Sequence, residues 1–402
     1  MAFYVVSAQS VLEHQTSDNL QSSLMIEQLF FELICVAIGS SNNLSHTPSA
    51  HNWGELYKMA KKQSLVGFCF AGIQKLVDSE HEDYCGMNEM LYLTWMGMAA
   101  KIQQKNEQMN VRTEETLDYF RAKGFHCQVL KGQGIAALYE YGGSNGSKGS
   151  NGSSLRNLRQ SGDVDVWINS SRKELYELSL KEIGKLEGLT YHHIHYPIFE
   201  DCEIEAHTWP SFLTNPLMNN RFQKFCSQYT LTSDSQDTPS LAFNRVFILQ
   251  HCYGHFCGHG VGMRQLLDYY FVLIKSYENE NQNENYKSES LQWISALGMK
   301  RFAEATMWVM KEIFGLDDKY LLCEPNEKDG RFLLAEVMET GNMGHLDERV
   351  DRKQLQSAGG RYLHNLKRDW KVARIAPSYA LWEPLWGIFQ FAFCKYMNLK
   401  YK

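Results

Sequence analysis

The sequence lacks any Cys-x-x-Cys pair, any excess of positive charge and any long uninterrupted apolar run. Its ten cysteines are scattered, so we expect reduced thiols in a cytoplasmic protein. The formal net charge of −6 gives no bulk attraction to nucleic acid. The chain does not open with a basic segment and an apolar core, and we find no stretch of about 18 apolar residues. Neither a secretory signal nor a transmembrane segment is therefore expected.

The composition is that of an ordinary globular protein of two or three domains. Its 402 residues are 44% hydrophobic and 21% charged, which suffices for a sizeable core. A long helix is predicted to run through Lys101–Lys123, following the apolar residues 90–100, and Gly124 should stop it. Further helical patterns cover Ser23–Ile38, two helices within Trp53–Val77, Ser171–Leu186, residues 241–275, Leu291–Phe314 and Arg331–Glu339.

Three segments have compositions that differ from the rest. Gly142–Ser154 contains only Gly, Ser, Asn and Lys, so we expect a flexible surface insertion, with a lid over substrate as the alternative. Glu278–Ser290 is rich in Asn and Glu and is predicted to be a solvated loop. Arg352–Lys402 is basic and aromatic, and Pro377 and Pro384 are predicted to interrupt it.

The aromatic residues of this last segment are Trp382, Trp386, Phe389, Phe391 and Phe393, with Lys395, Lys400 and Lys402 nearby. Such a combination is compatible with a membrane surface or a nucleic-acid face. The interpretation we favour is an aromatic helix packed on the core.

The chemistry of the chain is concentrated in residues 127–168. Two strand-like segments, Phe125–Leu130 and Asp163–Ile168, bracket this stretch. Because strand side chains alternate between faces, Asp163 and Asp165 should point the same way. Two such carboxylates repel each other unless a cation lies between them, and Mg²⁺ prefers oxygen ligands that it shares with phosphates. Lys131 and Gly132 precede a helix start, whose backbone N–H groups are suited to phosphate.

The ordered set Leu-Lys131-Gly132, Arg159-x-x-Gly162-Asp163-x-Asp165 and a later Glu205-x-His207 resembles a known group of enzymes. It is similar to uncharacterised bacterial nucleotidyltransferases of the DNA polymerase β-like superfamily, which are related to the AbiEii-type toxins. The resemblance covers about residues 50–275. It implies an α+β fold with a small mixed-sheet, polymerase β-like core. That core is expected at residues 91–212, between an N-terminal helical region (1–90) and a C-terminal helical domain (213–402).

The resemblance also implies roles for individual residues. Asp163, Asp165 and Glu205 would be the catalytic and metal-binding acids, holding Mg²⁺ or Mn²⁺, with Glu203 and Asp201 as alternatives to Glu205. The competing interpretation is a set of solvent-facing strand carboxylates. The residues expected to bind the nucleotide are Lys131, Gly132, Gln133, Gly134, Arg159, Gly162, His207, His255 and Arg264.

Two of these residues need comment. Gln133 departs from the Gly or Ser of the resembling families, so that only a backbone contact with phosphate is expected there. Arg159 is expected either to contact phosphate or to pair with an acid, and the sequence leaves both open. Arg264 and Asp268 are spaced i,i+4, and a helix-surface ion pair between them is the alternative to contact of Arg264 with the nucleotide.

The implied reaction moves a nucleoside monophosphate from an NTP to an acceptor hydroxyl whose identity stays open. Two alternatives remain. The first is that the chain is a non-catalytic nucleotide-binding module, and the second is that it is a zinc-dependent hydrolase. The hydrolase would use His251 and His255, whose i,i+4 spacing suits zinc, with His193, His195 and His207 as further ligands.

Overall fold

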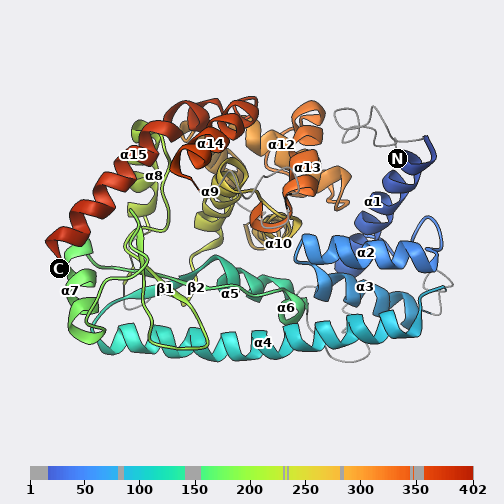
Figure 1. Ribbon diagram of the computed structural model, residues 1–402, viewed down its shortest axis with the longest axis horizontal. Coiled ribbons are helices and arrows are strands. Elements are labelled where there is room, and N and C mark those ends of the chain that lie inside the picture. The colour runs from blue at the N-terminus through green and yellow to red at the C-terminus, as the bar shows by residue number, and fades with distance from the viewer. Residues whose placement is uncertain are drawn as a thin grey trace.

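The structure, a computed structural model, describes residues 17–79, 86–140, 155–229, 231–232, 235–280, 285–344, 347 and 357–401. The glycine-rich insertion at Gly142–Ser154 lies outside these residues. The architecture is α+β, with a small sheet surrounded by helices (Figure 1), as predicted.

The sheet is mixed. Its strands are β1 (Cys127–Leu130), β2 (Val164–Ile168), β3 (His193–His195) and β4 (Ile204–His207), in the order β1-β2-β4-β3. The central pair, β2 and β4, is parallel, and the two outer pairs are antiparallel. The predicted mixed sheet is therefore confirmed. Among the described strands, the parallel pairing joins the strand of the Asp-x-Asp motif to that of the Glu-x-His motif.

The alternation of side chains along β2 divides the sheet into two faces. Val164, Val166 and Ile168 are buried in a core formed with α4 (Glu89–Ala122) and α7 (Arg172–Glu182). The opposite face carries Asp165 and Trp167. The Trp167 ring stacks on Phe243 of α9 (Leu241–Gly258), with centroids 5.6 Å apart. The face bearing Asp165 is thus turned toward the C-terminal helices.

Helix α4 joins the sheet to the N-terminal helices. Its 34 residues make it about 51 Å long, and it lies beneath both parts of the molecule (Figure 1). The Asn88 side chain caps its start, and Gly124, with φ of +88°, follows its end as predicted. The Trp95 indole N–H donates to the carbonyl of Val66 at 2.9 Å, which fixes α3 (Val66–Asp78) on α4.

The remaining N-terminal helices are α1 (Ser17–Ile38) and α2 (Ala50–Lys62), so the predicted helices of this region are confirmed. One window of α1 bears on the expected absence of a transmembrane segment. The window Gln21–Ile38, with mean hydropathy 1.4, is long and apolar enough to cross a membrane, although half of it is buried inside the protein. Since buried core helices meet the same criterion, this window is weak evidence for a membrane span.

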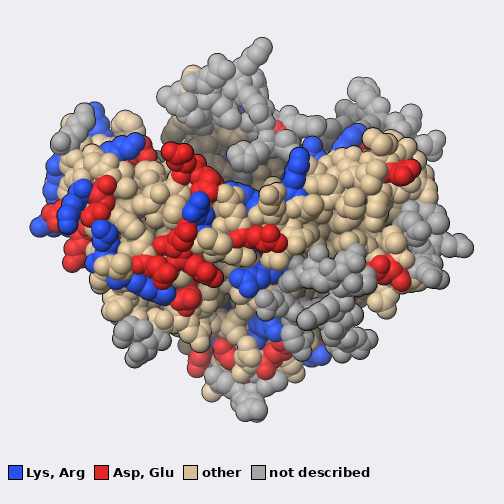
Figure 2. Space-filling view, turned by 90° about the horizontal axis from the view of Figure 1, so that it is seen from below, with Lys and Arg blue, Asp and Glu red and all other residues tan. Residues whose placement is uncertain are grey.

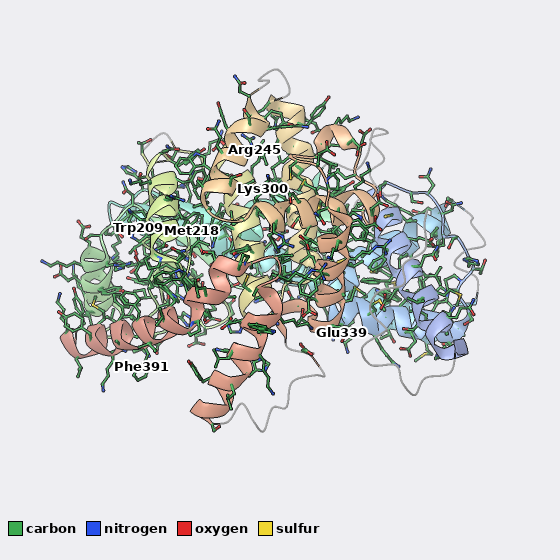
Figure 3. All side chains as sticks on the ribbon, turned by 90° about the horizontal axis from the view of Figure 1, so that it is seen from above. Trp209, Met218, Arg245, Lys300, Glu339 and Phe391 are labelled. Carbon is green, nitrogen blue, oxygen red and sulfur yellow. The ribbon has the colours of Figure 1, made fainter. Side chains whose placement is uncertain are left out.

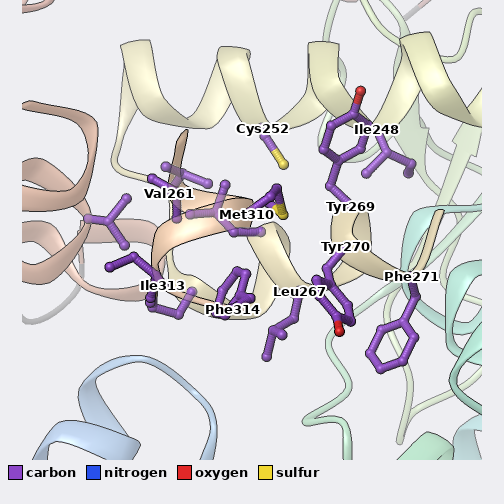
Figure 4. Close-up of a cluster of buried hydrophobic side chains, with 14 of the residues drawn as sticks. Ile248, Cys252, Val261, Leu267, Tyr269, Tyr270, Phe271, Met310, Ile313 and Phe314 are labelled. Carbon is purple, nitrogen blue, oxygen red and sulfur yellow. The ribbon is translucent and has the colours of Figure 1, made fainter. Parts of the chain in front are cut away.

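The C-terminal helices are α8 (Pro216–Ser227), α10 (Met263–Glu280), α11 (Tyr286–Ala296), α12 (Lys300–Glu312), α13 (Glu327–Thr340), α14 (Ala358–Val372) and α15 (Pro377–Lys400). Figure 4 shows Cys252 of α9 beside Tyr269 of α10 and Met310 of α12 in one buried cluster. That core extends from Ile26 in α1 to Ala376 before α15. The three predicted regions therefore share a continuous hydrophobic core, and the side chains fill the space between their ribbons (Figure 3).

Two sequence predictions about this half are wrong. The solvated loop expected at Glu278–Ser290 is wrong at both ends, because α10 continues to Glu280 and α11 begins at Tyr286, while residues 281–284 lie outside the described residues. Ser290 is buried and accepts a hydrogen bond from Arg245 Nε at 2.8 Å, so its polar character serves an interior contact. Pro384 does not interrupt the C-terminal helix, because α15 runs through it. Beyond the proline, Trp386 and Met397 are buried on one side of α15.

Charges of both signs are mixed on the face of the molecule that carries α4. Figure 2, seen from that side, shows Lys and Arg interspersed with Asp and Glu over the end that holds the sheet, and few charges near the N-terminal helices. A face that binds nucleic acid is instead dominated by basic residues. The described part of this face shows no such excess.

The packing of α3 gives a testable prediction. A Cβ atom added to Gly67 would lie 2.2 Å from the backbone oxygen of Leu158, whereas one added to Gly97 on α4 meets nothing within 4 Å. We expect Gly67→Ala to lower the free energy of unfolding by about 1–3 kcal/mol. Gly97→Ala should leave it unchanged or raise it by up to about 1 kcal/mol. Chemical denaturation of both variants provides the measurement, and equal effects would contradict this packing.

Candidate functional site

A cavity of about 850 Å³ lies between the sheet and the helices α9, α10, α14 and α15. This volume is in the range of small-molecule sites in proteins. Of the residues singled out in the sequence, the following line the cavity: Lys131, Gly132, Arg159, Gly162, Asp163, Asp165, Glu205, His251, His255 and Arg264. Residues from widely separated parts of the chain therefore meet in one place.

The strand register brings Asp165 and Glu205 together. They are direct partners on the parallel strands β2 and β4. His207 follows Glu205 on the same face of β4, and its Nε2 lies 2.9 Å from Asp165 Oδ1 and 3.2 Å from Glu205 Oε2. The His207 side chain is fully buried and does not line the cavity. Its place is beneath the two carboxylates, which it holds side by side.

The two alternatives to Glu205 are engaged elsewhere. Glu203 Oε1 lies 2.9 Å from His195 Nδ1, and Asp201 pairs with Arg112 at 3.0 Å. Neither acid lines the cavity. Of the three acids considered on this segment, only Glu205 is beside Asp165.

Lys131 covers Asp165 from the end of β1. Leu130 is the register partner of Asp165, so the next residue extends over that carboxylate. Lys131 Nζ lies 2.7 Å from Asp165 Oδ1, and only 17% of the lysine side chain is exposed. The turn is strained, because Lys131 adopts φ of +48° and Gly132 adopts φ of +31°. Such conformations cost roughly 1–3 kcal/mol each for non-glycine residues and are typical of functional sites.

The charges of Asp163 and Asp165 influence each other strongly. Repulsion from Asp165, with burial in the cleft, raises the pKa of Asp163 to about 6. Burial alone would raise the pKa of Asp165 too, but Lys131 and His207 hold it well below its usual range. Both acids were expected on an open face. This is correct for Asp163, which is exposed to the cavity, and wrong for Asp165, of which 3% is exposed.

The same contacts act on the basic partners. Burial would lower the pKa of Lys131 and that of His207, but the neighbouring carboxylates outweigh burial and raise both. Burial and the nearby histidine His207 instead lower the pKa of His193 to about 2. At the acidic end of the cavity, the charge of Asp165 is compensated by Lys131 and His207, whereas the charge of Asp163 is repelled by that of Asp165. This arrangement fits a divalent cation, which would relieve the repulsion.

Arg159 pairs with an acid, which answers the question that the sequence left open. Its Nε and Nη2 donate to the two carboxylate oxygens of Asp268 at 2.7 and 2.8 Å, and the Tyr139 hydroxyl donates to the same carboxylate. The alternative of a surface pair between Arg264 and Asp268 is therefore wrong. Asp268 points inward from α10 to Arg159, and Arg264 donates instead to the backbone oxygen of Gln160.

The two arginines give the cavity a basic wall. Burial and the charge of Arg159 lower the pKa of Arg264 to about 10. Arg159 Nη1 and Arg264 Nε are buried without a hydrogen-bond partner. Arg159 pairs directly with the carboxylate of Asp268, whereas the charges of Asp268 and Asp163 act on Arg264 by Coulomb attraction. Buried, unpaired N–H groups of arginine are suited to phosphate oxygens.

Two predicted phosphate-binding residues lie outside the cavity lining. The Gln133 side chain turns to α4, where Nε2 donates to Asn110 Oδ1 at 2.7 Å. Gly134 packs against the strand before it, since an added Cβ would lie 2.7 Å from the oxygen of Val129. The structure thus places Lys131 and Gly132, the first two residues of this turn, at the cavity, and the next two behind them.

The histidines fall into two groups. His251 and His255 lie on the α9 wall, with ring centroids 4.3 Å apart, and burial lowers the pKa of both, that of His255 to about 3. Three sets of described residues have donor atoms close enough to share a metal ion: His192–His193–His207, His193–His195–Glu205 and Asp165–Glu205–His207. None of these sets includes His251 or His255, the pair on α9. Among the described residues, the histidines close enough to share a metal ion lie on or next to β3 and β4.

Sequence reasoning missed His192 and misassigned the partner of Asp268. His192 lines the cavity beside His207, with ring centroids 5.1 Å apart. The sequence pattern that could have indicated it is His192-His193-x-His195, which lies at the strand next to that of the Glu-x-His motif. Asp268 gave no local signal, because its partner Arg159 is 109 residues away.

A family model described as "Uncharacterised nucleotidyltransferase" matches residues 49–315. The match includes the Lys-Gly turn, the acids of β2 and β4, and the arginines of the basic wall. No curated protein and no solved structure matches the chain. The relation to the AbiEii-type toxins stays a prediction.

The buried ion pair gives a second prediction. Asp268→Asn keeps the side-chain shape but leaves the Arg159 guanidinium uncompensated, so we expect the free energy of unfolding to fall by about 3–5 kcal/mol. Asp163→Asn removes one of two repelling carboxylates and should leave stability unchanged or slightly higher. Thermal and urea unfolding of the two variants test this. Similar losses for both would show that the charges are not arranged as described.

Proposed function

The chain belongs to this family of uncharacterised nucleotidyltransferases, and from that premise we propose that it transfers a nucleoside monophosphate from an NTP to a hydroxyl-bearing acceptor. One observation carries the proposal. The cavity holds the carboxylates of Asp165 and Glu205, paired by strand register, and its lining also includes the arginines Arg159 and Arg264. A metal–triphosphate needs both kinds of group.

We propose Mg²⁺, with Mn²⁺ as a substitute, as the metal held by Asp163, Asp165 and Glu205. Their oxygen atoms are the donors that these ions prefer, and the repulsion that raises the pKa of Asp163 supports the fit. When bound, the ion supplies charge neutralisation at the phosphates and lowers the pKa of the attacking hydroxyl. His207 would keep two of the carboxylates in place.

The other residues would bind and orient the nucleotide. Arg159 and Arg264 offer N–H donors to phosphate oxygens. Lys131 has a flexible four-carbon chain, so its ammonium group can move from Asp165 to a phosphate oxygen when another cation takes its place. Lys131 is then the group that exchanges partners as substrate binds.

The reaction forms one bond and breaks one. The acceptor oxygen bonds to the α-phosphorus, the bond from that phosphorus to the bridging oxygen breaks, and pyrophosphate leaves. The acceptor proton passes to a carboxylate of the acidic end.

The third prediction tests the metal-binding role of Asp163. Asp163 is a cleaner probe than Asp165, which also compensates Lys131 and His207. Asp163→Asn should reduce turnover by about 10³-fold, which corresponds to about 4 kcal/mol of transition-state stabilisation. Chelation by EDTA should abolish Mg²⁺-dependent NTP binding. The measurements are NTP affinity with and without Mg²⁺, and pyrophosphate release with a lysate of acceptors.

The matched control is Asp318→Asn, at a carboxylate whose side chain is 69% exposed and lies outside the cavity. It should behave like the wild type. If Asp163→Asn also binds Mg²⁺–NTP like the wild type, the assignment of the acids is wrong. Tight NTP binding without transfer to any acceptor would favour the non-catalytic binding module.

A further inference from the structure

A second cavity, of about 450 Å³, lies between α8 and α15. Its apolar lining comes from Tyr191, Trp382, Leu385, Trp386 and Phe389. The described residues that line it include no charged side chain. A pocket with this lining is suited to an aliphatic chain and unsuited to a phosphate or a metal ion.

Trp386 forms a wall shared by this pocket and the catalytic cavity. Its ring stacks on Phe212, with centroids 4.9 Å apart and an angle of 17° between the planes. Its indole N–H donates to Gln390 Oε1 at 3.1 Å, which fixes the ring at a second point. The apolar pocket is therefore a direct neighbour of the site where the acceptor must bind.

The outer side of α15 is apolar and exposed. Leu381, Leu385, Ile388 and Leu399 are 73%, 58%, 64% and 64% exposed. Their spacing places them along one side of the helix over about 27 Å. Phe391 is 72% exposed and lies on the outer edge of the molecule (Figure 3). The predicted packing of this helix on the core is thus wrong for its outer side. Two residues of α15, Leu385 and Phe389, belong both to the exposed apolar surface and to the lining of the pocket.

The charge of this region differs from that of the whole chain. Residues 357–401 contain seven Lys or Arg and two Asp or Glu, a net charge of +5, whereas the whole chain has −6. Lys395 and Lys400 are exposed on α15 itself, near the apolar residues. An apolar helix side with basic neighbours is the pattern that binds the surface of an anionic membrane.

We propose that the acceptor is an amphiphile taken from an anionic membrane surface. Its hydroxyl-bearing head would occupy the catalytic cavity, and its aliphatic chain would occupy the pocket between α8 and α15. The exposed side of α15 would rest on the lipid headgroups and bring the pocket to them. This inference rests on the proposed nucleotidyl transfer for the role of the head, but not for the binding of the chain.

The pocket is tested with 12-bromododecanol, because bromine quenches nearby tryptophan fluorescence and Trp382 and Trp386 line the pocket. Dodecanol, which lacks bromine, controls for changes in structure. We expect saturable quenching by the bromo compound alone, and a loss of most of it in a Trp382→Phe, Trp386→Phe variant. Leu385→Glu, which places a carboxylate in the lining, should weaken the apparent affinity at least tenfold.

The matched control is Leu217→Glu, at an apolar residue that is 70% exposed on α8 and does not line the pocket. It should bind the bromo compound like the wild type. Quenching that does not saturate, that survives the loss of both tryptophans, or that is equally weakened by both glutamate variants would overturn the assignment of the pocket.

The membrane surface is tested by sedimentation with vesicles of phosphatidylcholine, with or without phosphatidylglycerol. The wild type should sediment with the anionic vesicles and much less with the neutral ones, and added salt should release it. Ile388→Glu should reduce binding at least tenfold, and Leu217→Glu should not. No sedimentation, or a stable dimer in solution that Ile388→Glu dissociates, would overturn the membrane proposal and assign this surface to a second copy.

Mg²⁺–NTP affinity, measured on the same wild-type preparation, separates this inference from the proposed function. Chain binding without NTP binding would refute nucleotidyl transfer and keep the apolar site. NTP binding without chain or vesicle binding would refute the amphiphilic acceptor and keep the transferase.

Discussion

The buried carboxylate of Asp165 is the constraint on which the rest of the site depends. A buried charge is tolerated only with close partners, and here Lys131 and His207 supply them at 2.7 and 2.9 Å. One partner requires the strained turn after β1, and the other requires β4 to lie parallel to β2 in a single register. That register also sets Glu205 beside Asp165. The sheet is therefore small but strictly specified where the acids meet.

The helices complete the site with charge of the opposite sign. The bidentate contact of Arg159 with Asp268 ties the segment before β2 to α10, and it brings Arg264 of the same helix to the cavity. Acidic and basic groups then line one space. Helix α15 closes that space with Trp386 and presents its other side to solvent. A single helix thus lies between the cavity that holds the acids and the exposed apolar surface.

The sequence predicted what short-range patterns determine. The period of two along β2 correctly placed the valines opposite Asp165. The Glu-x-His motif singled out Glu205, which the strand register places beside Asp165. Contacts across long separations were not predictable: nothing near Asp268 indicates Arg159, and the i,i+4 rule favoured Arg264 instead. The aromatic residues of α15 favoured a helix packed on the core, but helical periodicity shows only that a helix has an apolar side and not what covers it.

The most direct test of the metal-dependent transferase is a crystal structure of the wild type with Mn²⁺ and a non-hydrolysable NTP analogue, with the anomalous signal of manganese locating the ion. The account predicts manganese bound by Asp163, Asp165 and Glu205, phosphate oxygens within hydrogen-bond distance of Arg159 or Arg264, and Lys131 Nζ turned from Asp165 to a phosphate. Manganese held by His193 and His195 instead, or a triphosphate outside this cavity, would contradict it.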